Sequence, residues 1–243
     1  MAEAKEKTKE ENFGLNLEKM AEAGLHFGHR TSRTHPKMKP YISGTKNNVH
    51  IIDLEKTAQY LKEALKFIKR IISENKTLLL VGTKIQIKEL IKETAKECSL
   101  PFINERWLGG TFTNFDTIKK RIAYFKALEK RKQSGELEKY TKKEKAKIDK
   151  ELKELEIKFG GIKDMEKLPD AVFVSDMKKD SLAIKEAGEK GITVIAICDT
   201  NTNPTLVDFP IPANDDAISS VKYILEKIKE VITKAKIKPE KER

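Results

Sequence analysis

The sequence predicts a three-layer α/β/α fold built on a parallel sheet of about five strands. Short, continuously apolar runs alternate with helical stretches along most of the chain, which is typical of strands buried on both faces. One connection is far longer than a crossover needs, which indicates an insertion. A length of 243 residues suits one large α/β domain with an inserted unit.

The first elements are a short helix and a hairpin. Residues 15–24 have amphipathic spacing, and Gly24 is expected to end that helix. The turn-rich stretch GTKNN lies between apolar segments at 41–43 and 49–53, which predicts a β-hairpin. Helical periodicity then continues through Arg70.

Five apolar runs are the expected strands of the main sheet, and helices are expected after three of them. The runs are 77–81, 101–103, 171–174, 193–198 and 209–211, and the helices are 85–98, 181–190 and 215–235.

The long connection predicts a helical hairpin over residues 116–159. Its apolar residues are spaced three and four apart, as in a coiled-coil seam: Ile118, Ile122, Phe125, Leu128, Ile148, Leu152, Leu155 and Phe159. We expect two antiparallel helices joined near Gly135. These 44 residues hold 15 Lys and Arg against 9 Asp and Glu, a pattern that fits either an RNA-contacting arm or a solvated charged surface.

The predicted domain organisation follows from these elements. A single α/β domain is formed by 13–115 and 160–232, and the hairpin of 116–159 is inserted into it. Residues 1–12 are expected to be a disordered N-terminal arm, and residues 233–243 a basic C-terminal tail.

The charge balance indicates a polyanionic partner. The chain has 49 Lys and Arg against 38 Asp and Glu, a net charge of +11, and such a field attracts nucleic acid. Only 7 of the cations are Arg, and Lys suits phosphate contacts better than bidentate base reading. The same composition also fits a generally Lys-rich proteome.

Composition argues against several other classes. Cys98 and Cys198 form no CxxC pair, so neither a disulfide framework nor a zinc ribbon is predicted. No apolar run approaches the roughly 20 residues that span a bilayer, so no membrane partner is predicted. The N-terminus has no signal-like apolar region and no Arg- and Ser-rich leader, which favours a bacterial cytoplasm.

A phosphate site is one candidate, and it supports an alternative function, that of an α/β enzyme that binds a nucleotide or another phospho-ligand. Gly82, Thr83 and Lys84 follow a predicted strand and precede a helix, where free N–H groups and a Lys can hold a phosphate. The P-loop pattern is incomplete, and GxGxxG does not occur. The simpler interpretation is that Thr83 caps the helix.

Metal binding and catalysis have weaker support. His26 and His29 are three residues apart, and Asp199 ends a predicted strand, but HxxH without a partner motif is a weak metal signal. Several Asp residues follow predicted strands, yet no nucleophile motif accompanies them, and Asp216 reads as a helix start. We therefore predict no catalytic residue, metal site, cofactor or small-molecule substrate.

RNA binding explains the unusual residues better. Cationic residues, His rings and stiffening prolines are interleaved between 26 and 46, and such a rigid loop can contact phosphates and stack on bases. Near 106–114, Gly109 and Gly110 allow close backbone approach, and Asn114 can bond a sugar or base edge. Trp107 could contact RNA or anchor the core.

Strings in these segments resemble a known family. HFGHRT, HPKMKPYI, NNVHIIDLEKT, RWLGG, GGIKDM, LPD and VDFPIPANDDAI occur in the order found in the small-subunit ribosomal protein S-two family, in its bacterial and organellar form. The similarity spans roughly residues 13 to 232. It implies a flavodoxin-like fold with an inserted helical hairpin.

The resemblance also implies a function. A member of this family is a structural constituent of the small ribosomal subunit in the cytoplasm and not an enzyme. Its partners are small-subunit rRNA, neighbouring small-subunit proteins and, where present, ribosomal protein S-one. The residues predicted to contact RNA are His26, Gly28, His29, Arg30, Thr31, Arg33, Pro36, Lys37, Met38, Lys39, Tyr41, Asn47, Lys84, Arg106, Trp107, Gly109, Gly110 and Asn114.

Overall fold

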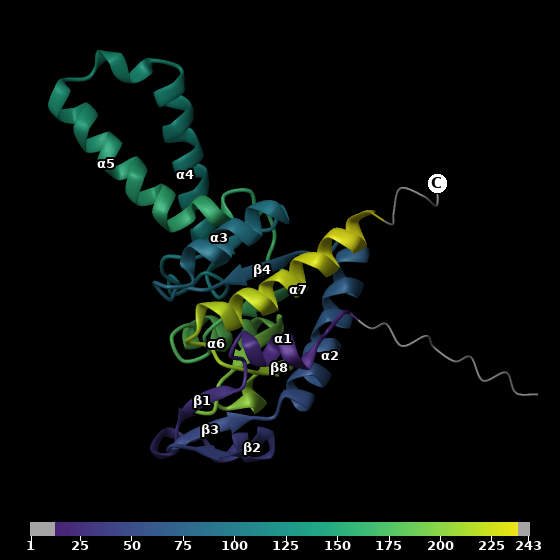
Figure 1. The fold of residues 1–243 in the computed structure, drawn as a ribbon. Helices are drawn as coiled ribbons and strands as arrows, with labels where there is room; N and C mark the ends of the chain where they lie inside the picture. The colour runs from purple at the N-terminus through teal and green to yellow at the C-terminus, as the bar shows by residue number, and fades with distance from the viewer. Residues whose placement is uncertain (1–12, 238–243) are drawn as a thin grey trace, which may run out of the picture.

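A five-stranded parallel sheet forms the centre of the molecule in the computed structural model, which describes residues 13–237 (Figure 1). The strand order is β5-β4-β6-β7-β8, so the chain adds strands first on one side of β4 and then on the other. The strands are β4 (Leu78–Val81), β5 (Phe102–Ile103), β6 (Ala171–Val174), β7 (Thr193–Cys198) and β8 (Phe209–Pro212). All five predicted apolar runs are therefore confirmed as strands.

Successive residues of each strand enter two different cores, because side chains alternate across a sheet. Leu78 and Leu80 of β4 pack into one apolar cluster, and Leu79 and Val81 pack into the other. All four are fully buried. A strand with both faces buried must be apolar at every position, so continuous runs mark this sheet in the sequence.

Helices cover both faces of the sheet, which confirms the predicted three layers. One core is shared with α1 (Leu17–Glu22), α2 (Leu54–Ser73), α3 (Lys88–Glu97) and α7 (Ile218–Ile237). The other is shared with α6 (Ser181–Lys190) and the base of the inserted hairpin.

A second, antiparallel sheet precedes α2, in the order β1-β3-β2. Strands β2 (Ile42–Lys46) and β3 (Val49–Ile52) form the predicted hairpin. Its two-residue turn places Asn47 and Asn48 at φ 50° and 61°, the left-handed conformation that a type I′ turn requires. The third strand, β1 (Phe27–Arg30), lies in a segment that the sequence predicts as a loop.

The insertion is the predicted helical hairpin and projects from the sheet domain (Figure 1). It consists of α4 (Phe115–Gln133) and α5 (Lys142–Phe159). Gly135 lies just after α4 with φ 75°, and a capping box between Thr141 and Glu144 starts α5. The predicted seam is buried or half-buried along its whole length.

The helices at the two ends of the described chain differ in length from the prediction. The first helix is shorter than predicted, and Gly24 follows it with φ 76°. The predicted arm of residues 1–12 lies outside the described residues. Helix α7 extends to Ile237, so the start of the predicted tail at residue 233 is helical.

Candidate nucleic-acid interface

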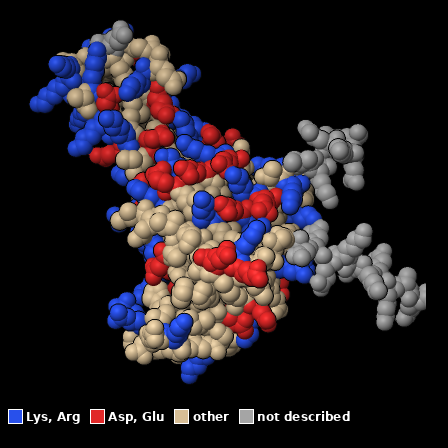
Figure 2. Space-filling model, viewed as in Figure 1, with Lys and Arg blue, Asp and Glu red and all other residues tan. Residues whose placement is uncertain are grey.

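The basic loop, defined as residues 26–41, is an ordered platform of β1 followed by two short 3₁₀ helices. Most of the residues predicted to contact RNA here are exposed. The exposed members are Arg30, Thr31, Arg33, Pro36, Lys37 and Lys39. Figure 2 shows Lys and Arg side chains at this end of the molecule and again over the outer part of the hairpin.

Thr200, which follows β7, holds the basic loop against the main sheet. Its hydroxyl accepts from the His29 N–H at 2.9 Å, and its carbonyl accepts from the His35 N–H at 2.8 Å. A Cβ on Gly28 would lie 2.6 Å from Thr200 Cγ2, so only glycine allows this approach. The exposed cations of the basic loop therefore project from a backbone that Thr200 holds in place.

Three predicted contact residues have structural roles as well. Met38 is fully buried in the core cluster that also contains Trp107, so its side chain anchors the loop. Tyr41 is half-buried, and its hydroxyl lies 3.4 Å from that of Tyr60. Asn47 is exposed at the β2–β3 turn.

His29 connects the small sheet to the carboxyl edge of the main sheet. Its Nδ1 lies 3.1 Å from Asp199 Oδ2, and its Nε2 lies 3.5 Å from Asp216 Oδ2. The hydrogen bond to Asp199 raises the pKa of His29 despite the opposing effect of burial. His26 differs, since burial and the nearby Lys46 lower its pKa.

Lys84 lies inside a cluster of carboxylates at the switch point between β4 and β6. Its Nζ is 3.1 Å from Asp176, 3.2 Å from Asp215 and 2.6 Å from Asp216. Burial opposes its charge, but these carboxylates raise its pKa above the ordinary value. Burial, together with the neighbouring Asp199 and Asp176, raises the pKa of Asp215 to about 7.

This cluster changes the interpretation of the Gly82–Lys84 segment. The Lys84 amine faces carboxylates, which repel a phosphate. A Cβ on Gly82 would lie 2.6 Å from Ser175 Oγ, so this glycine serves close packing. The predicted Thr83 cap is wrong: the Thr83 hydroxyl donates to Asp180 at 2.7 Å, and α3 has no side-chain cap at its N-terminus.

The expected helix-start role of Asp216 is also wrong. Asn214 Oδ1 accepts the N–H groups of Asp216 and Ala217 before α7, and the Asp216 carboxylate faces Lys84 and His29 instead. The local sequence pattern predicts the Asp216 side chain as a helix cap, but it forms ion pairs with Lys84 and His29 instead.

The RWLGG turn, defined as residues 106–114, is organised by Glu186, a residue that the sequence pattern does not predict as functional. This carboxylate is only 4% exposed and accepts five hydrogen bonds. The donors are Trp107 Nε1, the N–H groups of Gly110, Phe112 and Thr113, and the Thr113 hydroxyl. Burial opposes ionisation, but these donors outweigh it and lower the pKa of Glu186.

The turn presents a mixture of buried and exposed residues. Trp107 is 7% exposed and packs edge-on against Phe112, so its ring is a core anchor. Arg106, Gly109 and Asn114 are exposed around it. Gly110 has φ 89°, which explains glycine at that position.

The position of Glu186 leaves a faint trace in the sequence. Within α6, Glu186 lies on the buried face, three residues after Ala183 and one residue before Ala187. A charged residue on an otherwise apolar helix face indicates that buried hydrogen-bond partners surround its side chain.

We expect the free energy of unfolding to fall as pH rises from about 6 to 8. His29 has a raised pKa, so its contribution is complete below the unfolded value of about 6.5 and is lost as pH rises through the folded value. Asp215 acts in the same direction, because a raised folded pKa favours its protonated form. Urea denaturation of wild type and His29→Gln at several pH values should show that the free energy of unfolding declines less steeply with pH in the variant. Parallel curves would contradict the assignment to His29.

The described residues contain no cluster of three or more His, Cys, Asp and Glu side chains arranged to hold a metal ion. The four histidines do not converge: His29 faces Asp199, and His50 contacts Thr34 and Thr45. No helix within residues 13–237 has the length and apolar character needed to cross a membrane.

The fold and this surface define a class: an α/β scaffold whose switch point is occupied by internal ion pairs and whose exposed cations lie on ordered loops. Comparison with known proteins identifies the family. The family model for ribosomal protein S2 matches residues 20–235. The chain therefore belongs to the ribosomal protein S2 family, a structural protein of the ribosome rather than an enzyme.

The curated relatives of this chain are small ribosomal subunit proteins. The small ribosomal subunit protein uS2 of Dictyoglomus thermophilum is 48% identical over 93% of this chain and 92% of its own length. The uS2 protein of Nitratiruptor sp. is 44% identical over 91% of this chain and 83% of its own length. That of Coprothermobacter proteolyticus is 46% identical over 90% of this chain and 81% of its own length. The resemblance stated from the sequence motifs is confirmed.

Proposed function

We propose that this chain is a structural constituent of the small ribosomal subunit that binds small-subunit rRNA through the basic loop and the RWLGG turn. The observation that carries the proposal is the set of exposed cations on a backbone fixed by Thr200. Arg30, Arg33, Lys37 and Lys39 lie in the basic loop, and Arg106 lies in the turn.

The two segments are physically coupled. Met38 of the basic loop and Trp107 of the turn pack into the same core cluster. RNA backbone can approach Gly109, which has no side chain, while the cations neutralise phosphates. Recognition would depend on shape and charge, because RNA helices are read mainly through backbone and 2′-hydroxyl contacts.

The remaining predicted contact residues contribute by position. Gly28 and His29 set the backbone of the basic loop, and Asn47 extends the surface along the β2–β3 turn. Lys84 supports the loop indirectly, because Asp216 contacts both Lys84 and His29. Its role is thus to position the loop, with no free amine for phosphate.

The hairpin forms a separate surface in this proposal. Residues 116–159 pack through their own seam and are tied to the domain by ion pairs of Lys126 with Asp164 and of Lys163 with Glu129. We assign neighbouring small-subunit proteins, and ribosomal protein S-one where it is present, as further partners in the cytoplasm.

Replacing Arg30, Lys37 and Lys39 together with Ala should weaken incorporation into small subunits. Removing three phosphate contacts should reduce the slope of log affinity against log salt by about 2 to 3, at roughly 0.7 to 0.9 per contact. The measurement is sucrose-gradient sedimentation of tagged protein at moderate and high salt, with RNA-binding titrations across salt.

The matched control replaces Lys66, Lys185 and Lys190, which are exposed on α2 and α6, with Ala. This variant loses the same charge and should sediment like wild type. Equal behaviour of the two triple variants would refute the basic loop as the contact. Absence of wild type from small subunits at both salt levels would refute the function itself.

A further inference from the structure

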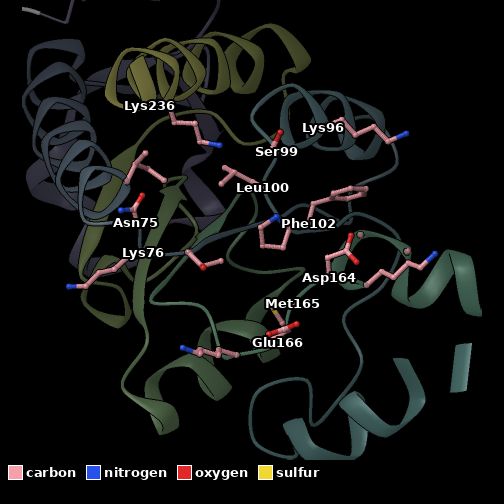
Figure 3. A pocket seen from close by; sticks show the side chains of 17 residues that line it. Asn75, Lys76, Lys96, Ser99, Leu100, Phe102, Asp164, Met165, Glu166 and Lys236 are labelled. Atoms are coloured by element: carbon pink, nitrogen blue, oxygen red, sulfur yellow. The ribbon is translucent and has the colours of Figure 1, made fainter. Parts of the chain in front are cut away.

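A cavity of about 900 Å³ opens at the amino edge of the parallel sheet, opposite the Lys84 cluster (Figure 3). Its walls are the ends of α2, α3 and α7, the residues entering β4 and β5, and the turn that follows the hairpin. The volume is within the range of roughly 300 to 1,000 Å³ typical of ligand sites. None of the RNA-contact residues predicted from the sequence lies in it.

The cavity rim is cationic. Five lysines line it against two carboxylates, Asp164 and Glu166; the lysines are Lys76, Lys96, Lys163, Lys167 and Lys236. Lys76 and Lys163 are paired with Glu74 and Glu129. The other three form no ion pair within the described part of the chain, and Lys236 donates only to the uncharged Cys98 carbonyl at 2.6 Å.

One wall of the cavity is apolar. Leu100, Pro101, Phe102 and Met165 contribute to it. A Cβ on Gly161 would lie 2.1 Å from the Phe102 carbonyl oxygen, so the glycine turn is pressed against β5. Figure 3 shows the Phe102 ring at the cavity wall and Lys236 extending toward Ser99 and Leu100. An aromatic wall beside unpaired cations suits a base and its phosphates.

Helix termini account for part of this charge. Lys96 is in the last turn of α3 and Lys236 in that of α7, where cations offset the negative end of the helix dipole. Lys167 is outside all helices, in the segment after the hairpin. Its unpaired charge and the aromatic wall have no such explanation.

We propose that this cavity binds a single-stranded segment of RNA, with a base against Phe102 and adjacent phosphates held by Lys96, Lys167 and Lys236. The inference rests on the proposed RNA-binding function and adds a second site to it. Free nucleotides share the same chemistry, but phosphates on either side of the base engage more of the cationic rim than one phosphate can.

The test is fluorescence anisotropy of a short labelled oligouridylate with the full chain at low salt. The double variant Lys96→Glu and Lys167→Glu should bind about tenfold or more weakly, since it reverses two phosphate contacts. Lys66→Glu with Lys185→Glu gives the same net charge away from the cavity and should cost less than about threefold. Phe102→Leu should weaken binding about fivefold through lost stacking, with thermal unfolding verifying its fold.

Equal losses in the two double variants would overturn the cavity assignment, because net charge alone would explain them. Competition by uridine monophosphate as effective as that by the oligonucleotide would overturn the RNA assignment in favour of a free nucleotide. A loss confined to the Arg30, Lys37 and Lys39 variant would overturn this inference and leave the proposed function standing. Sedimentation of wild type away from small subunits would overturn the proposed function whatever the cavity variants do.

Discussion

Replacing Lys84 with Met should lower the free energy of unfolding by about 3 to 5 kcal/mol, because removing one partner leaves buried charges uncompensated. Asp176 and Asp215, which face the Lys84 amine, are almost fully buried. Urea denaturation at pH 8 measures the loss. The loss should shrink toward pH 5, since Asp215, with a pKa of about 7, then carries a proton.

The matched control is Lys88→Met on the neighbouring helix. Lys88 pairs with Glu105 at 3.0 Å, but both side chains are about one-third exposed. Such a surface pair contributes at most about 1 kcal/mol. Equal destabilisation by the two variants would show that the Lys84 cluster is no more than another surface network.

Replacing Glu186 with Ala should cost at least about 3 kcal/mol of unfolding free energy, because buried donors left without an acceptor each cost about 1 to 3 kcal/mol. Four of the five donors are N–H groups fixed by the turn and by the Trp107 ring. Thermal and urea unfolding measure the effect, and Trp107 fluorescence reports the turn directly.

Glu189→Ala is the control, since Glu189 is exposed on the same helix and should change stability by no more than about 0.5 kcal/mol. Glu186→Gln should give an intermediate loss, because the amide supplies one acceptor oxygen and a donor that opposes the turn. A Glu186→Ala protein as stable as wild type would show that the turn is held by its apolar residues alone.

The main sheet and the hairpin seam could be predicted because local patterns record burial. Residues 171–174 are apolar without interruption because both faces of β6 are covered. Ile118 and Ile122 repeat at helical spacing because α4 faces α5. Such periodicities survive in the sequence whatever else the fold does.

The missed features depend on contacts between distant segments. Strand β1 has only four residues and contains Gly28, so its ladder with β3 leaves no alternating pattern. Thr83 and Asp216 have the sequence context of caps but bond to Asp180 and Lys84, which are distant in the sequence. No rule based on neighbouring positions identifies such partners.

The strand order also governs when this chain can fold during its synthesis. Strand β4 pairs along its length with β6, which follows the entire hairpin, and α2 packs in the same core as α7, which follows all five strands of the main sheet. A nascent chain that stops before α7 leaves exposed the part of the apolar side of α2 that packs against α7. Completion of the domain is therefore tied to release of α7 from the exit tunnel, and chaperones can act during the interval before that release.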